Sequence, residues 1–204
     1  PDGVREWRQK ELLVNGETRT ISHEAGYGGV VEVDYLPSCN LFIRRALFDE
    51  VGGYDPGYFY LMEDADLCFR VRQLGYRCLA SDATAVEHRL VLHDRVGDLF
   101  LSHRNRVRFA LLNYPAWRVA LLPALDVALA ASPYKLGALW GGKVSAVKHL
   151  SPEVRKMDGG VLGFPRKLAA VGAGYLSSLA RAYAWNVQHA RDTLDQRRRA
   201  RGAG

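Results

Sequence analysis

The chain has 204 residues, an apolar fraction of 48% and a formal net charge of +6. This composition is ordinary for a globular protein, and the length suits one domain, or one domain with an extension. The three cysteines are odd in number and lack zinc-like spacing, which indicates reduced, mostly buried thiols in a cytosolic setting.

Charge is distributed unevenly along the chain. Residues 1–90 contain 10 Lys and Arg against 15 Asp and Glu, whereas residues 91–204 contain 18 against 7. An acidic half joined to a basic half suggests two roles, and the basic half suits nucleic acid, anionic lipid or a phosphorylated substrate. The opening Pro1-Asp2-Gly3 resembles neither a signal peptide nor a natural start, so a fragment of a longer protein is expected.

The first ninety residues alternate β-rich segments with helical ones, which predicts an α/β fold. The expected elements are a polar segment at 1–15, a loop at 16–29, strands at 30–36 and 41–43, a short helix at 44–51, a helix from 63 that ends at Gly75, and strands at 76–80 and 84–88.

The remaining residues are mainly helical in pattern. Helices are expected at 94–113 and 168–194, and an apolar stretch at 119–134 is broken by Pro123, Asp126 and Pro133 and is too short to span a membrane. Residues 135–149 mix apolar side chains with lysines, which suits a membrane surface. The Arg-rich end, 197–201, is expected to be solvated and disordered.

The stretch from Val51 to Tyr76 carries the chemistry. A glycine-rich turn and an aromatic run, Tyr58-Phe59-Tyr60, precede three carboxylates at the start of a helix, Glu63, Asp64 and Asp66. Acidic residues at this position cap open backbone N–H groups and suit the helix dipole. A cap needs one carboxylate, however, and crowded carboxylates beside aromatic side chains also suit a general base.

Several short motifs stand in a defined order: Asn40-Leu41-Phe42-Ile43-Arg44-Arg45, Val51-Gly52-Gly53-Tyr54-Asp55, Glu63-Asp64-x-Asp66-Leu67-Cys68-x-Arg70, Gly75-Tyr76-Arg77 and a later His88. Together they resemble the C-terminal half of the catalytic domain of a family 2 glycosyltransferase, over about residues 13–114. The resemblance implies the second half of a GT-A fold, a Rossmann-like nucleotide-diphospho-sugar transferase fold, at residues 1–93. Residues 94–204 would form a basic helical extension.

The resemblance also implies roles for individual residues. Asp64 would be the base of an inverting transfer, and Glu63 would help to hold the acceptor. Asp66 and Arg70 would order the site by pairing or capping. Asn40 either bonds substrate or shapes its turn, and the sequence leaves both open.

The resemblance further implies dependence on a divalent cation, Mg²⁺ or Mn²⁺. His88 ends an expected strand and would be a metal ligand, the alternative being a structural or exposed histidine. The main metal ligands, an Asp-x-Asp pair, would lie in an upstream nucleotide-binding half that this chain lacks. Asp64-x-Asp66 is therefore not that pair, and the 204 residues alone are expected to be inactive.

The function implied is transfer of a hexosyl or rhamnosyl group from a nucleotide-sugar donor to a glycan or lipid-linked acceptor, in cell-envelope or polysaccharide synthesis. Arg104 would contact the donor diphosphate, unless it belongs to a solvated basic helix face. The expected location is cytoplasmic, peripheral at the inner face of the cell membrane, with an anionic membrane surface as a partner. The alternative is a non-catalytic basic module that binds anionic membrane or nucleic acid. No nucleic-acid motif is present, however, and nucleic acid is not expected as a partner.

Overall fold

The computed structural model describes residues 7–23, 28–83, 99–130 and 163–202. The chain divides into two compact units, Pro1–Leu90 and Val91–Gly204. The predicted domain boundary at residues 93 and 94, the predicted strand at 84–88 and the start of the predicted helix at 94–113 all lie outside the described residues, so these stay predictions.

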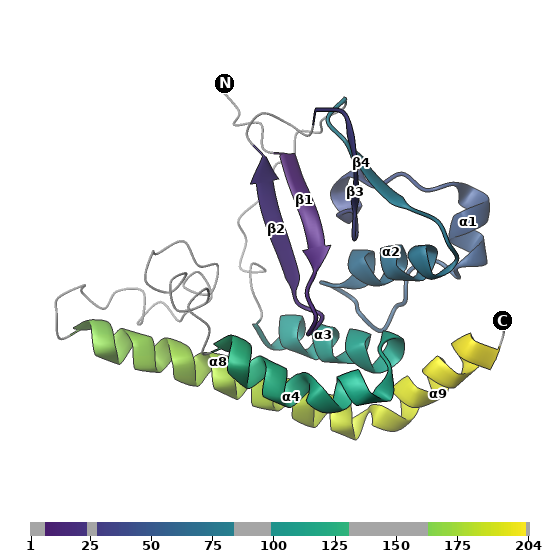
Figure 1. Cartoon of the computed structure of the whole chain (residues 1–204). Helices are drawn as coiled ribbons and strands as arrows, with labels where there is room; N and C mark the ends of the chain where they lie inside the picture. The colour runs from purple at the N-terminus through teal and green to yellow at the C-terminus, as the bar shows by residue number, and fades with distance from the viewer. Residues whose placement is uncertain (1–6, 24–27, 84–98, 131–162, 203–204) are drawn as a thin grey trace. The chain divides into compact units, whose positions relative to one another are not determined.

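The first unit begins with a β-hairpin. Strands β1 (Trp7–Leu12) and β2 (Thr18–His23) pair antiparallel (Figure 1). The polar segment and loop predicted here are therefore wrong in part. Thr18 and Ile21 are β-branched and favour extended backbone, and Glu11 stands opposite Arg19 and pairs with it across the strands.

The core of the first unit lies between a second sheet and a helix. Strand β3 (Val30–Val33) pairs antiparallel with β4 (Cys78–Ser81), and helix α2 (Glu63–Gln73) supplies the facing side chains. The buried residues of this core are Val33, Tyr35, Ala65, Cys68, Cys78 and Ala80. The predicted helix and both strands are confirmed within a few residues, and this mixture of helices and small sheets is compatible with an α/β fold.

A long connection joins β3 to α2 and contains a 3₁₀ helix, η1 (Ser38–Asn40), and helix α1 (Arg45–Glu50). The short buried strand predicted at 41–43 is wrong. Phe42 is 88% exposed, and the segment between η1 and α1 has no assigned strand. Leu41 nevertheless packs against the core, which accounts for the apolar character that suggested a strand.

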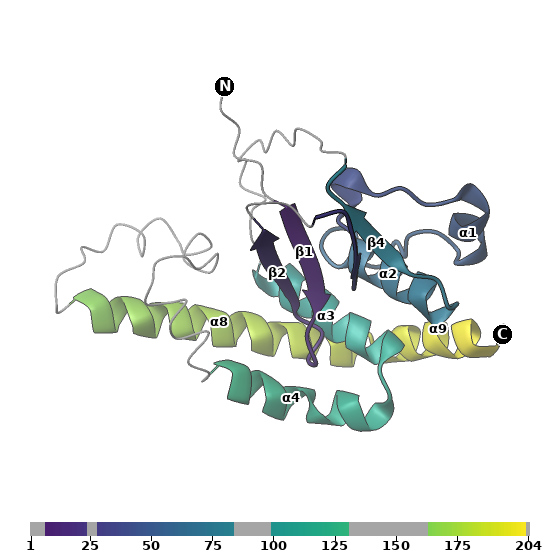
Figure 2. The ribbon, with the colours of Figure 1, turned by 45° about the horizontal axis from the view of Figure 1, so that its top comes forward.

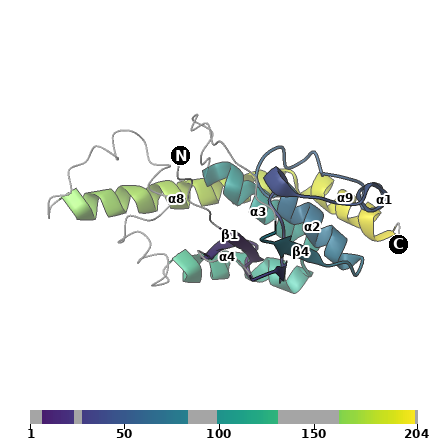
Figure 3. The ribbon, with the colours of Figure 1, turned by 90° about the horizontal axis from the view of Figure 1, so that it is seen from above.

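The second unit is helical. Its described helices are α3 (Leu99–Asn113), α4 (Ala116–Ala130), α8 (Gly163–Gln188) and α9 (Ala190–Gly202). Helix α4 runs back in the direction from which α3 came (Figure 2), and α9 continues from the end of α8 (Figure 3). Within the described part of the chain, no helix combines the length and apolar character needed to cross a membrane.

The end of the chain differs from the prediction. The single helix expected at 168–194 is two helices, and the Arg-rich end is helical in α9, not disordered up to Gly202. Arginine is a good helix former, and Arg198 pairs with Asp195 one turn earlier. Arg197 also donates a hydrogen bond of 2.7 Å to the carbonyl of Leu111 in α3, which ties α9 to the rest of the unit.

A buried ion pair joins helices of the second unit. Arg106 of α3 contacts Asp126 of α4 at 2.7 Å, and their side chains are 3% and 1% exposed. Tyr183 of α8 donates its hydroxyl to the same carboxylate at 2.7 Å. Asp126 therefore does not interrupt α4, and a solvated basic face on α3 is wrong for His103, Asn105 and Arg106, all of which are buried.

Candidate active site

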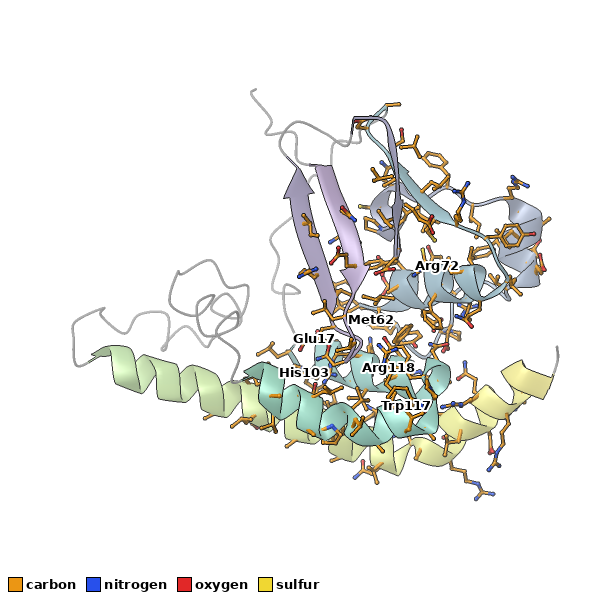
Figure 4. The ribbon with its side chains drawn as sticks, viewed as in Figure 1. Glu17, Met62, Arg72, His103, Trp117 and Arg118 are labelled. Carbon is orange, nitrogen blue, oxygen red and sulfur yellow. The ribbon has the colours of Figure 1, made fainter. Side chains whose placement is uncertain are left out.

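The backbone immediately before α2 is held in an unusual conformation. Phe59, Leu61 and Met62 have φ values of 59°, 67° and 73°, in the left-handed region that L-residues other than glycine seldom adopt. Each such residue costs roughly 1–2 kcal/mol, and strained residues of this kind cluster at functional sites. Met62 directly precedes the carboxylates (Figure 4), so the strain lies next to the candidate catalytic groups.

The three carboxylates occupy the first turn of α2. The capping residue is Met62, and no side chain caps the helix at that position. Asp64 Oδ1 accepts a hydrogen bond of 2.8 Å from the backbone N–H of Ala65. Helix capping therefore accounts for part of the role of Asp64, and it leaves Glu63 and Asp66 to be explained by other contacts.

Asp66 is bound on both of its oxygens. The hydroxyl of Tyr58 donates to Oδ1 at 3.1 Å, and Nε of Arg70 donates to Oδ2 at 2.8 Å. Arg70 also donates to the carbonyls of Val51 at 2.5 Å and Gly53 at 2.7 Å. We call this set of contacts the Arg70 clamp: the guanidinium fastens the glycine turn to α2, and Tyr58 fastens the aromatic run to the same carboxylate.

The glycine turn has a steric requirement at Gly53. Its φ is 67°, and a Cβ at this position would lie 3.2 Å from two ring carbons of Phe48. Only glycine avoids both the strain and the close contact. The Gly53 carbonyl that Arg70 binds is thus placed by a turn whose shape depends on glycine.

Asp64 is half-buried and is fixed by backbone donors. Besides Ala65, a backbone hydrogen bond with Ser38 holds its carboxylate against η1. Burial raises the pKa of Asp64, while these hydrogen bonds and the charge of Lys10 act in the opposite direction. A raised pKa brings a carboxylate closer to the range in which a base accepts a proton from a hydroxyl and later releases it.

Glu63 is half-buried, and its Oε2 is enclosed with no hydrogen-bond partner among the described residues. Burial raises the pKa of Glu63, a hydrogen bond from its own backbone N–H acts in the opposite direction, and the charge of Asp64 raises the pKa further. A buried carboxylate oxygen without a donor is unfavourable. A hydroxyl group of a bound ligand would supply the missing donor.

The metal prediction has no support among the residues that the structure describes. No group of three or more His, Cys, Asp or Glu side chains there could hold an ion. Asp66 is already bound by Tyr58 and Arg70, so it does not form a metal pair with Asp64. His88 lies outside the described residues, and its role as a ligand stays a prediction.

Two other predicted residues, Asn40 and Arg104, belong to other elements. Asn40 is half-buried at the end of η1, the element that Ser38 joins to Asp64. Arg104 belongs to α3 in the second unit, where Nε donates to Asn105 Oδ1 at 2.8 Å and the guanidinium lies 4.8 Å from the centre of the Trp185 ring. Substrate roles for Asn40 and Arg104 stay predictions.

Three residues near the carboxylates were not singled out from the sequence. Tyr58 is completely buried and binds Asp66, although it reads as one of several aromatic residues. Burial and then the charge of Asp64 raise the pKa of Tyr35 to about 12, against a hydrogen bond from Thr18 that lowers it. Lys10 acts on Asp64 from β1, a strand that the sequence did not predict. Of these three residues, only Tyr35 has a signal in the sequence. It follows Val33 by two positions in a β-rich segment, and this alternation places both side chains on the core side.

Comparison with known proteins gives one kind of relative. Over 88 residues the chain is 30% identical to N-acetylglucosaminyl-diphospho-decaprenol L-rhamnosyltransferase from two strains of Mycobacterium tuberculosis. The match covers 42% of this chain and 29% of each relative, so it is partial and distant. No family model and no solved structure matches the chain. This similarity supports a glycosyltransferase at the level of the general activity.

Proposed function

We propose that the first unit is the acceptor side of an inverting glycosyltransferase. The observation that carries the proposal is the different bonding of neighbouring carboxylates at the start of α2. Asp66 is occupied by Tyr58 and Arg70, whereas Glu63 keeps an enclosed oxygen without a donor. Most buried carboxylate oxygens have a donor, so the unpaired Glu63 oxygen beside Asp64 suits a site that awaits a hydroxyl ligand.

The proposed reaction uses the carboxylates in different roles. The half-buried Glu63 carboxyl accepts a hydrogen bond from the acceptor sugar and orients it. Asp64 takes the proton of the attacking hydroxyl while that oxygen forms a bond to the anomeric carbon of the donor. The bond between the anomeric carbon and the nucleotide diphosphate breaks, and the diphosphate leaves with the electron pair. The Arg70 clamp keeps the strained loop and α2 in the geometry that this transfer needs.

The substrates are proposed from the partial similarity. A nucleotide-activated hexose or rhamnose is the donor, and a glycan or lipid-linked sugar is the acceptor. The same proposal includes a divalent cation, a GT-A architecture and a donor role for Arg104. It also includes a peripheral location at the inner face of the cell membrane. The match covers 29% of each relative, so we propose that the donor contacts other than Arg104 lie outside the matched residues.

The test is a transfer assay on the full-length protein that contains these residues. Nucleotide-activated sugars, rhamnose included, are incubated with a polyprenyl-diphosphate-linked N-acetylglucosamine, and products are identified by mass spectrometry. We expect a single sugar to be added to the lipid-linked acceptor. Absence of transfer to lipid-linked and to free glycan acceptors, with a protein whose melting curve shows that it is folded, would contradict the proposal.

The second candidate is a non-catalytic module that binds an anionic surface. The basic balance of residues 91–204 favours it for the second unit. It gives no role to the enclosed oxygen of Glu63 in the first unit. Sugar transfer therefore fits the first unit, and binding to an anionic surface fits the second. Transfer assays with and without added lipid vesicles separate the two activities.

A further inference from the structure

The side of α4 that faces solvent is apolar throughout. Each exposed residue of this helix whose side chain the structure describes is apolar, with Trp117, Leu121 and Val127 exposed by 67%, 49% and 66%. The other exposed residues of the helix are alanines and Pro123. Ala116 and Pro123 are exposed as well, and we call the other six exposed residues the α4 outer face; its members are Trp117, Ala120, Leu121, Ala124, Val127 and Ala128.

Helix geometry places these residues on one side. At 3.6 residues per turn the six positions fall within an arc of about 120°, and Leu122 and Asp126 lie on the opposite side. Both of these are about as buried as any residue in the unit, at 1% exposure each. The helix therefore has its only buried charge on the inside, held by Arg106, and an apolar surface on the outside. An apolar surface of this kind marks an interaction site more often than ordinary solvent contact.

We propose that the α4 outer face binds an anionic membrane surface, with the helix lying in the plane of the interface. The helix has 15 residues and contains Pro123, and it lacks the length to span a bilayer. Trp117, near its start (Figure 4), has a ring that suits the level of the lipid headgroups. Apolar residues on one side and an interfacial tryptophan are the features of helices that lie on a membrane.

Charge decides between a membrane and a second copy of this chain. Among the exposed side chains described on α8 and α9 there are four arginines and one aspartate. The arginines are Arg181, Arg191, Arg198 and Arg199. Residues 91–204 as a whole carry 18 Lys and Arg against 7 Asp and Glu, so two copies repel each other, whereas an anionic surface attracts them. This surface belongs to the second unit alone; the inference rests on the membrane binding proposed above for that unit, and not on the transfer reaction.

The experiment is vesicle flotation of the full chain. Vesicles of phosphatidylcholine alone are compared with vesicles that also contain phosphatidylglycerol, at low and high salt. The test variant combines Trp117→Ser with Val127→Ser, and the matched control is Phe42→Ser, which removes an even more exposed aromatic side chain from the first unit. All three positions are exposed, so melting curves should stay close to that of the wild type.

We expect the wild type and Phe42→Ser to float with phosphatidylglycerol vesicles, less so at high salt, and the double variant to bind at least about tenfold more weakly. Equal binding of the double variant would remove α4 from the binding surface. Equal recovery on phosphatidylcholine alone, or none on either vesicle, would contradict an anionic membrane as partner. A dimer in sedimentation that the double variant loses would show instead that a second copy occupies this face.

Discussion

The hydroxyl of Tyr58 donates a hydrogen bond of 3.1 Å to Oδ1 of Asp66, and both side chains are almost completely buried. This bond spans the strained residues that lie between them in the sequence. Because Asp66 is also bound by Arg70, the loop cannot relax without leaving a buried carboxylate short of a donor. The strain before α2 is therefore maintained by the Arg70 clamp.

Tyr58→Phe removes this hydroxyl and keeps the ring. We expect the free energy of unfolding to fall by about 1–2 kcal/mol, because Asp66 loses one donor in a buried position. For a unit of this size the melting temperature should fall by roughly 5 °C or more. The matched control is Tyr76→Phe, since Tyr76 is 44% exposed. Equal melting temperatures for the two variants would show that the Tyr58 hydroxyl does not hold the loop.

Asp64 and Asp66 should respond differently to the same substitution. Asp64→Asn keeps a group that can accept hydrogen bonds from Ala65 and Ser38, so the fold should persist while transfer by the full-length protein falls at least about a hundredfold. Asp66→Asn should cost about 2–3 kcal/mol of stability, below the value for a fully buried pair because Arg70 is 26% exposed. Kinetics and melting curves of both variants test whether Asp64 is catalytic and Asp66 structural. Transfer by Asp64→Asn within about tenfold of wild type would remove Asp64 from the role of base.

Activity should depend on pH in a direction set by Asp64. Burial raises the pKa of this carboxyl, and a base works only when it is ionised. The acid limb of kcat/KM should therefore lie above the ordinary aspartate pKa of about 3.9. A limb at or below that value would indicate that another group is the base.

Glu63 gives a stability prediction with a defined sign. Burial raises its pKa, so the folded state holds this proton more tightly than the unfolded chain does. The stabilisation from this group is complete below the unfolded pKa of about 4.3 and is lost as the pH rises through the higher folded pKa. Glu63→Gln should thus melt higher than wild type at neutral pH, with the difference disappearing in acid. Glu50→Gln, at an exposed glutamate, is the control. A melting temperature of Glu63→Gln below that of the wild type at neutral pH would contradict a raised pKa for Glu63.

The sequence predicted elements whose signals are local. Gly75 and the spacing of Leu67 and Val71 were enough to place α2, and the β-rich run at Val30–Val33 was enough for β3. The sequence does not predict the hairpin β1–β2, because its stability comes from cross-strand pairs such as Glu11 with Arg19. No local sequence pattern indicates such a pair.

Partner-dependent features were missed for the same reason. The sequence alone presents Asp126 as a break in an apolar stretch, since nothing nearby in the sequence shows that Arg106 and Tyr183 bind it. Tyr58 likewise stood out only once its hydroxyl was seen to reach Asp66. The candidate carboxylates could be chosen from the sequence, but the different bonding of Glu63, Asp64 and Asp66 could not.

The buried pair of Arg106 and Asp126 should be costly to break and much less costly to replace. Asp126→Ala leaves Arg106 charged in the interior, and we expect the free energy of unfolding to fall by about 3–5 kcal/mol. Changing Arg106 to Met, Asp126 to Leu and Tyr183 to Phe together should recover most of that loss, because apolar side chains replace all three members of this buried set. Denaturant unfolding measures both variants. A triple variant no more stable than Asp126→Ala would mean that the packing around the pair, and not its charge balance, sets the cost.

Phe59 combines left-handed backbone with an exposed ring, and two substitutions separate these properties. Phe59→Gly and Phe59→Ala both remove a ring that is 88% exposed, but only glycine relieves the strain of a φ of 59°. Relief of roughly 1–2 kcal/mol is offset by about 0.5–1 kcal/mol of glycine entropy, so the glycine variant should be more stable than the alanine variant by up to about 1 kcal/mol.

An exposed aromatic ring four residues before Glu63 has no role in packing, and its apolar face suits the C–H surface of an acceptor sugar. Both Phe59 variants should therefore raise the KM for acceptor in the full-length protein by a similar factor, about five- to tenfold, with a smaller change in kcat. If the ring binds acceptor, the two KM values move together while the stabilities diverge. If instead KM follows stability, so that glycine and alanine differ in both, the backbone conformation at Phe59 and not its side chain is what the acceptor site uses.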